Sequence, residues 1–147
     1  MLRLTQEHVN YSFRAVVSYL DSHGTREVLY TSPSETIDNL DDPVQGEVTI
    51  VGEPKEGVKL RAVSNSLSDE DGIASINISW DKSRDGRNWR ALNSLSGPSL
   101  QLNQSLVGSQ VRARVAVVDN FGIETNLYSQ ATRTVENVNN KPSGRIV

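Results

Sequence analysis

Apolar and polar residues alternate with a period of two along most of this chain. The clearest case is residues 111–117, where four apolar residues at alternate positions are separated by Arg112, Arg114 and Ala116. Alternation of this kind places one row of side chains in a core and the other row toward solvent, as in a half-buried β-strand. A helical period does not recur, so we predict a chain built from strands.

Seven short segments of this kind follow one another between residues 41 and 140. The breaks between them carry turn residues such as Asp71-Gly72 and Asp85-Gly86. This spacing predicts an all-β fold, a seven-strand antiparallel sandwich of the immunoglobulin-like type, with Trp80 as the buried aromatic of the third strand. A β-barrel is the competing architecture. The expected strands are centred on residues 48–50, 58–62, 76–80, 89–91, 100–102, 111–117 and 124–135.

The first third of the chain repeats the last third without a gap. Residues 4–49 align with residues 102–147 at a constant offset of 98, and 13 of the 46 aligned residues are identical. A period of this length exceeds that of solenoid repeats and fits one small domain. The residues of the first copy that recur are Leu4, Gln6, Val9, Arg14, Ala15, Val17, Asp21, Gly24, Leu29, Tyr30, Thr36, Asn39 and Gly46.

The repeat predicts tandem modules and places their boundaries. Residues 1–40 are expected to be the C-terminal part of one repeat, residues 41–140 a complete repeat, and residues 141–147 the start of the next. The chain would then be a window from a longer array. Because a part-module without its first strands exposes sheet edges, residues 1–40 are candidates for disorder or for strand exchange with another copy.

Composition argues against several classes of function. The net charge of −3 lacks the basic excess expected of a nucleic-acid-binding protein, and the absence of cysteine excludes disulfides and thiolate metal sites. No apolar run approaches the roughly 18 residues of a membrane span, so we expect no membrane insertion. The only histidines, His8 and His23, lie outside the complete repeat, so Ser–His or Cys–His catalysis is impossible there. We expect no enzyme.

Acidic residues gather in three connections, at residues 38–43, 69–72 and 119–122. If successive strands alternate in direction, these three connections meet at one end of the sandwich, at the junction with the preceding repeat. Carboxylates held together repel one another unless a cation neutralises them, and Ca²⁺ takes about six to eight oxygen ligands. We therefore expect a structural calcium site at this junction. The simpler alternative is that Asp and Gly serve only as turn residues.

Two further features suggest ligand binding. Trp80 and Trp89 could stack on a sugar, but Trp80 is expected in the core, which leaves Trp89 undecided. The arginines at positions 84, 87 and 90 could contact an anionic partner, although a solvated charged strand is the simpler interpretation. The turn at Asp85-Gly86 is expected to be a plain hairpin connection.

Several of these segments together resemble a known family. Residues 67–72 (Leu-Ser-Asp-Glu-Asp-Gly), the downstream Trp80, and residues 137–142 (Asn-Val-Asn-Asn-Lys-Pro) are similar to the immunoglobulin-like or cadherin-like tandem repeats of bacterial RTX adhesins. The resemblance implies a very large extracellular protein, exported by type I secretion and held at the bacterial cell surface for attachment and biofilm formation. Its repeats would be extender modules whose partners are calcium and the neighbouring repeats, while other domains contact a host or surface ligand.

The resemblance also implies a ligand set for calcium. The sequence departs from the family pattern at Asn140, where the family has Asp, and at Pro43, which comes one residue earlier than Pro142. These departures predict that binding at one junction is weaker, absent or rebuilt from other oxygens. The alternative function is a carbohydrate- or protein-binding module within the adhesin, although the chain has no long insertion of the kind such modules carry. The implied ligands are Asp69 and Asp71 from the first loop, Asp119 from the second, and Asn39, Asp41 and Asp42 from the linker.

Overall fold

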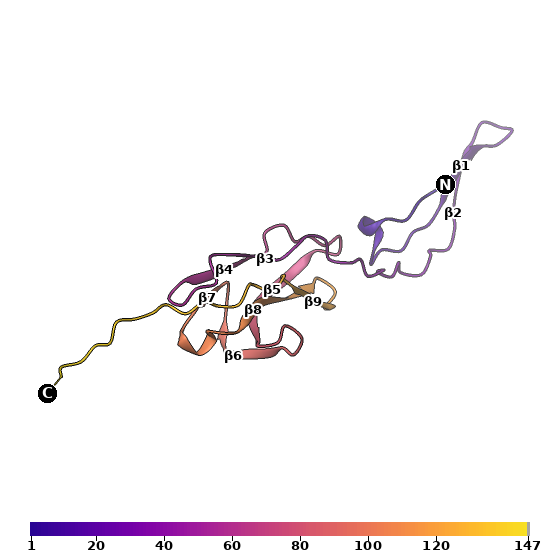
Figure 1. Ribbon diagram of the computed structural model, residues 1–147. Helices are drawn as coiled ribbons and strands as arrows, with labels where there is room; N and C mark the ends of the chain where they lie inside the picture. The colour runs from indigo at the N-terminus through magenta and orange to yellow at the C-terminus, as the bar shows by residue number, and fades with distance from the viewer. Residues whose placement is uncertain (147) are drawn as a thin grey trace. The chain divides into compact units, whose positions relative to one another are not determined.

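The computed structural model describes residues 1–146. The chain divides into two compact units, with the boundary between Asp41 and Asp42. All named strands pair in antiparallel fashion (Figure 1). The helices of the described residues are single 3₁₀ turns, η1 (Gln6–His8) and η2 (Gln104–Leu106), and none is long and apolar enough to cross a membrane. The predicted all-β class is therefore confirmed.

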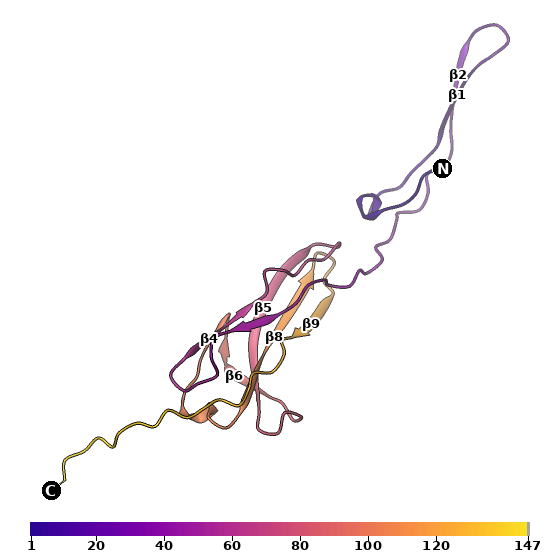
Figure 2. The same ribbon diagram turned by 45° about the horizontal axis from the view of Figure 1, so that its top comes forward.

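The second unit contains two antiparallel sheets, an arrangement consistent with a β-sandwich. The long strands β5 and β8 run side by side at the centre of the larger sheet (Figure 2). The smaller sheet has the order β3-β4-β7, formed by β3 (Thr49–Val51), β4 (Lys59–Val63) and β7 (Ser99–Gln101). The larger has the order β6-β5-β8-β9, formed by β5 (Ile73–Ser83), β6 (Arg90–Ser96), β8 (Gln110–Asp119) and β9 (Glu124–Tyr128).

The core of the second unit is built from alternate residues of these strands. In β8 the odd-numbered residues are buried and the even-numbered ones are half-buried, which is the alternation that the sequence predicted. Trp80 is fully buried, and its indole Nε1 donates a hydrogen bond to the Gly97 carbonyl at 3.0 Å. Smaller apolar side chains of the core such as Leu60 and Val115 are also fully buried, and each contributes about 1.5–3 kcal/mol.

Burial along β5 differs in one respect from the expected pattern. Ile76 was expected to share the inward row with Ile78 and Trp80, but Ile76 is 39% exposed while Trp80 is fully buried. The strand is 11 residues long, whereas the strands of the smaller sheet have only 3 to 5 residues. The smaller sheet is therefore too short to cover the side chains in the first part of β5, among them Ile76.

The last predicted strand, residues 124–135, has regular pairing only as far as Tyr128. Beyond that point two side-chain hydroxyls replace backbone carbonyls in the ladder. Ser129 Oγ accepts a hydrogen bond from the Ala113 amide at 2.9 Å, and Thr132 Oγ1 accepts one from the Val111 amide at 3.1 Å. The three steps along the chain from Ser129 to Thr132 lie opposite only two steps along β8, from Ala113 to Val111. The extra residue makes the chain bulge, and the regular strand ends.

The first unit is a two-stranded hairpin with the single turn η1 before it. Its strands β1 (Val16–Leu20) and β2 (Arg26–Tyr30) are exposed at every residue. The expected start of a third repeat, residues 141–147, contains no strand in its described part, residues 141–146, and residue 147 lies outside the described residues.

Candidate metal centre

The loops at 69–72 and 119–122 lie together at the point where the chain enters the second unit. The backbone amide of Asp42 donates a hydrogen bond to Asp71 Oδ2 at 2.9 Å, and the amide of Asn120 donates one to the Gly72 carbonyl at 3.3 Å. Three segments that are far apart in the sequence thus converge on Asp71 and Gly72.

A tight turn directs Asp71 inward. Asp69 Oδ1 accepts a hydrogen bond from the Asp71 amide at 2.8 Å, and the Gly72 amide donates to the Asp69 carbonyl at 3.0 Å. Gly72 has φ = +81°, and a Cβ there would collide with the side-chain amide of Asn120. Only glycine fits this backbone position without strain. The turn leaves Asp71 just 4% exposed.

Asp119 occupies the last inward position of β8, and it is also 4% exposed. Its Oδ1 accepts hydrogen bonds from the amides of Phe121 and Ile123, both at 2.8 Å, which closes the turn into β9. This residue therefore has a structural role in the turn in addition to any role as a ligand.

Three of the predicted ligand residues form one group. Asp41, Asp71 and Asp119 each place a carboxylate oxygen within 4.8 Å of the other two. Among the described residues, Asp71 Oδ1 is a buried side-chain oxygen without a hydrogen-bond donor. Asp71 and Asp119 are buried and Asp41 is exposed. Two buried carboxylates this close together are unfavourable unless something neutralises them, and a buried acceptor without a donor needs an explanation. A hard cation would satisfy both requirements.

The other three predicted ligand residues make different contacts. Asp69 holds the turn before Asp71, and Asp42 contributes its backbone amide rather than its carboxylate. Asn39 Oδ1 accepts a hydrogen bond from Gln6 Nε2 at 2.8 Å within the first unit. Loop aspartates serve both as ligands and as turn residues, so the sequence pattern could not separate the two roles.

An arginine between two aromatic rings covers Trp89. The Arg112 guanidinium lies 4.3 Å from the Trp89 ring centroid and 4.2 Å from that of Tyr128, and its Nε donates to Asp81 Oδ2 at 3.1 Å. One face of Trp89 is therefore occupied by a cation, which reduces the area available for stacking on a sugar. The sequence placed Arg112 on the outward row but contained no signal for this stack.

The turn between β5 and β6 is organised by Asp85. Its carboxylate accepts hydrogen bonds from the amides of Asn88 and Arg87, from the Asn88 side chain and from the Ser83 hydroxyl. The two backbone amides are the main reason that the pKa of Asp85 lies well below its usual range, because they favour the charged form.

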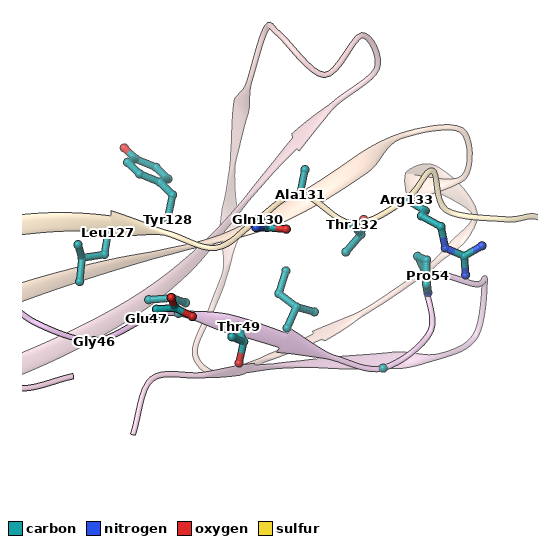
Figure 3. A pocket seen from close by; sticks show the side chains of 13 residues that line it. Gly46, Glu47, Thr49, Pro54, Leu127, Tyr128, Gln130, Ala131, Thr132 and Arg133 are labelled. Carbon is teal, nitrogen blue, oxygen red and sulfur yellow. The ribbon is translucent and has the colours of Figure 1, made fainter. Parts of the chain in front are cut away.

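A groove of about 660 Å³ runs between β3 and the segment around β9 (Figure 3). Glu47, Thr49 and Pro54 line one side, and Tyr128 and Arg133 line the other. The strands β3 and β9 are each at the edge of their sheet. This groove offers both polar side chains and strand edges.

The chain matches no protein-family model, no curated protein and no solved structure.

Proposed function

We propose that the repeat starting near Asp41 is a non-enzymatic extender module of a large secreted adhesin at the bacterial cell surface, with an immunoglobulin-like fold and a bound calcium ion. The observation that supports calcium is the buried Asp71 Oδ1, which lacks a donor and lies in a group of three carboxylates. The observation that supports a repeating structural module is the internal repeat at an offset of 98 residues.

Asp41, Asp71 and Asp119 are the proposed protein ligands. Three carboxylates supply between three and six oxygens, and the rest of a calcium coordination sphere of about six to eight would come from water and backbone carbonyls. Asp71 Oδ2 already accepts the Asp42 amide, so Oδ1 is the oxygen available to the ion.

Calcium would act as a structural cross-link. Binding would hold the backbone at Asp41 against the loops that carry Asp71 and Asp119, and would thereby remove freedom from the residues that enter the module. An ion that binds only the folded state adds RT ln(1 + [Ca²⁺]/Kd) to stability, or about 2.7 kcal/mol at a hundredfold excess over Kd. An extender that must resist pulling benefits from both effects.

Calorimetry of the chain in millimolar calcium and in excess chelator tests this proposal. We expect calcium to raise the unfolding midpoint of the wild type, and we expect Asp71→Asn to remove most of that rise. Asp21→Asn is the control for loss of a turn aspartate outside the acidic group, because Asp21 accepts hydrogen bonds from the amides of His23 and Thr25 in the other unit, as Asp119 does in its own turn. A wild-type midpoint that calcium does not change would rule out the site.

The groove between β3 and β9 favours a second candidate, a module that binds carbohydrate or protein. Thr49→Trp would fill the groove from an edge strand, and Trp89→Ala would remove the half-buried aromatic. If either substitution abolished binding in a glycan screen or an adhesion assay while the calcium-dependent midpoint stayed unchanged, the ligand-binding function would be favoured over the extender.

A further inference from the structure

The hairpin of the first unit has the same strand pairing as the hairpin of the second. In β1 and β2, Val16 pairs with Tyr30, and at an offset of 98 Arg114 pairs with Tyr128. All five pairs of each ladder obey the same offset. The similarity extends to hydroxyl contacts, because Thr31 Oγ1 accepts from the Ala15 amide at 2.9 Å, as Ser129 Oγ does from Ala113.

The similarity continues outside the strands. The turns η1 and η2 occupy equivalent positions. Asn10 has φ = +67° where Gly108 has φ = +79°, so a non-glycine residue takes the same left-handed conformation as the glycine. The first unit therefore has the local structure of the C-terminal part of a complete repeat.

The two hairpins differ in what covers them. Val115 and Val117 are at most 1% exposed, whereas their equivalents Val17 and Tyr19 are 52% and 49% exposed. Before the hairpin, Leu102 is 1% exposed and its equivalent Leu4 is 49% exposed. In the second unit this face packs on the core around Trp80. In the first unit the same apolar face is open.

The two hairpins also differ at one strand edge. The strand β8 pairs with β9 on one side and with β5 on the other, over ten positions from Ile73 to Ser83. Its equivalent β1 pairs with β2 alone. The edge of β1 that corresponds to the β5 side is therefore free among the described residues, and a free edge with an apolar face is a template for another strand.

A charged residue, Arg14, also distinguishes this edge of the first hairpin. Across β5 and β8, Asp81 and Arg112 form an ion pair at 3.1 Å. Arg14 stands at the position of Arg112 and likewise lies over a tyrosine ring, Tyr30, at 4.3 Å. Within residues 1–146, however, Arg14 makes no ion pair. A strand of the β5 type would bring a carboxylate to it.

We propose that the first unit is a receptor for a stretch of chain with the sequence pattern of residues 42–98, and that β1 takes up its β5-type strand in antiparallel register. By the register of β5 on β8, the equivalent of Asp81 would pair with Arg14, that of Trp80 with Ala15, and that of Ile78 with Val17. The contacts between this segment and β1 would be equivalent to those that β5 makes with β8 in the second unit. This proposal does not depend on calcium.

The test places an extra copy of residues 42–98 directly before Met1 of the full chain. At the offset of 98, this junction puts Leu2 at the position of Leu100, so the natural connection is retained. We expect the added copy to fold onto the hairpin, giving a second cooperative unfolding transition in calorimetry. The amides of β1 should gain hydrogen-exchange protection on the order of a thousandfold.

A matched control carries Trp80→Ser in the added copy only, and it should lose the second transition. Failure of the extended chain to protect β1, or equal protection in the control, would overturn the proposal.

Sedimentation of the unextended chain tests whether a second copy of the chain covers the same face instead. We expect a monomer, and a dimer that Val17→Asp dissociates would overturn the proposal by showing that a second copy covers this face. The calcium response of β8 amides is read separately, so the two proposals fail independently.

Discussion

The two hairpins of this chain share one local structure and differ in almost all of their burial. β1–β2 and β8–β9 have the same register, equivalent hydroxyl contacts and equivalent aspartate-capped turns. Yet every residue of β1 is exposed, while alternate residues of β8 are buried. Hydrogen bonding of a hairpin is therefore encoded locally, whereas the free energy from apolar burial depends on strands that only the second unit possesses.

The largest expected contrast comes from one charge placed on the inward row of each hairpin. Val115→Asp should destabilise the second unit by about 4 kcal/mol or more, because it buries an unpaired carboxylate in place of an apolar side chain. Val17→Asp should change stability by about 0.5 kcal/mol at most, because the site is exposed. Hydrogen exchange of each hairpin measures both effects. Equal losses in the two hairpins would mean that the face of β1 is covered in solution.

Removal of calcium should have the next largest effect. Chelation should lower the stability of the second unit by about 2.7 kcal/mol relative to calcium at a hundredfold excess over Kd, and should leave the β1–β2 hairpin unchanged. Asp21 closes the equivalent turn of that hairpin but belongs to no group of acidic residues among those described. Hydrogen exchange with and without chelator separates the two turns, and a calcium response at Asp21 would contradict the assignment.

Removing the arginine that lies over an aromatic ring in each hairpin should have an effect of intermediate size on stability. Arg112→Gln should destabilise the second unit by about 2 kcal/mol, because it removes contacts with two rings and leaves the nearly buried Asp81 without its ion pair. Arg14→Gln removes a contact with one exposed ring and should cost about 0.5 kcal/mol. Urea titration, with hydrogen exchange for the first unit, provides the measurement. Similar losses would show that the ion pair contributes little.

The smallest effect is expected at Asp85, in a turn that the first unit lacks. Its pKa is lowered in the folded state, so its stabilising effect is present above the unfolded-state pKa of about 4 and is lost as pH falls toward the folded-state value. Asp85→Asn should therefore lower the midpoint slightly at pH 7, and the difference from wild type should shrink below pH 4. A difference that persists at pH 2 would mean that the carboxylate charge is not its cause.

Much of the second unit could be predicted from residue patterns. Alternation in residues 111–117 identified β8 and its buried row, and turn residues placed the breaks at Gly72 and Gly86. The exposure of Ile76 could not be predicted, because it depends on the length of the opposing strands. The early end of β9 at Tyr128 could not be predicted, because the hydroxyls of Ser129 and Thr132 take the place of backbone carbonyls as hydrogen-bond acceptors.

The candidate site divides in the same way. Acidic loops and alternating strand directions indicated that residues 69–72 and 119–122 meet, since that follows from topology. Which aspartates bring their carboxylates together and which hold turns is decided by differences of a few ångströms in side-chain position. Asp41, Asp71 and Asp119 are grouped, while Asp69 and Asn39 bind elsewhere, and no spacing rule distinguishes them.

By itself, the sequence determined the period of 98 residues, the strand alternation and the local hairpin, because each depends on residues close together in the chain. Only the tertiary structure decided that Asp71 Oδ1 is buried without a donor and that Arg112 lies between two rings. It also decided that one copy of the hairpin is covered and the other is open. These features depend on which distant strands pack against one another, and burial and electrostatic pairing are properties of that packing.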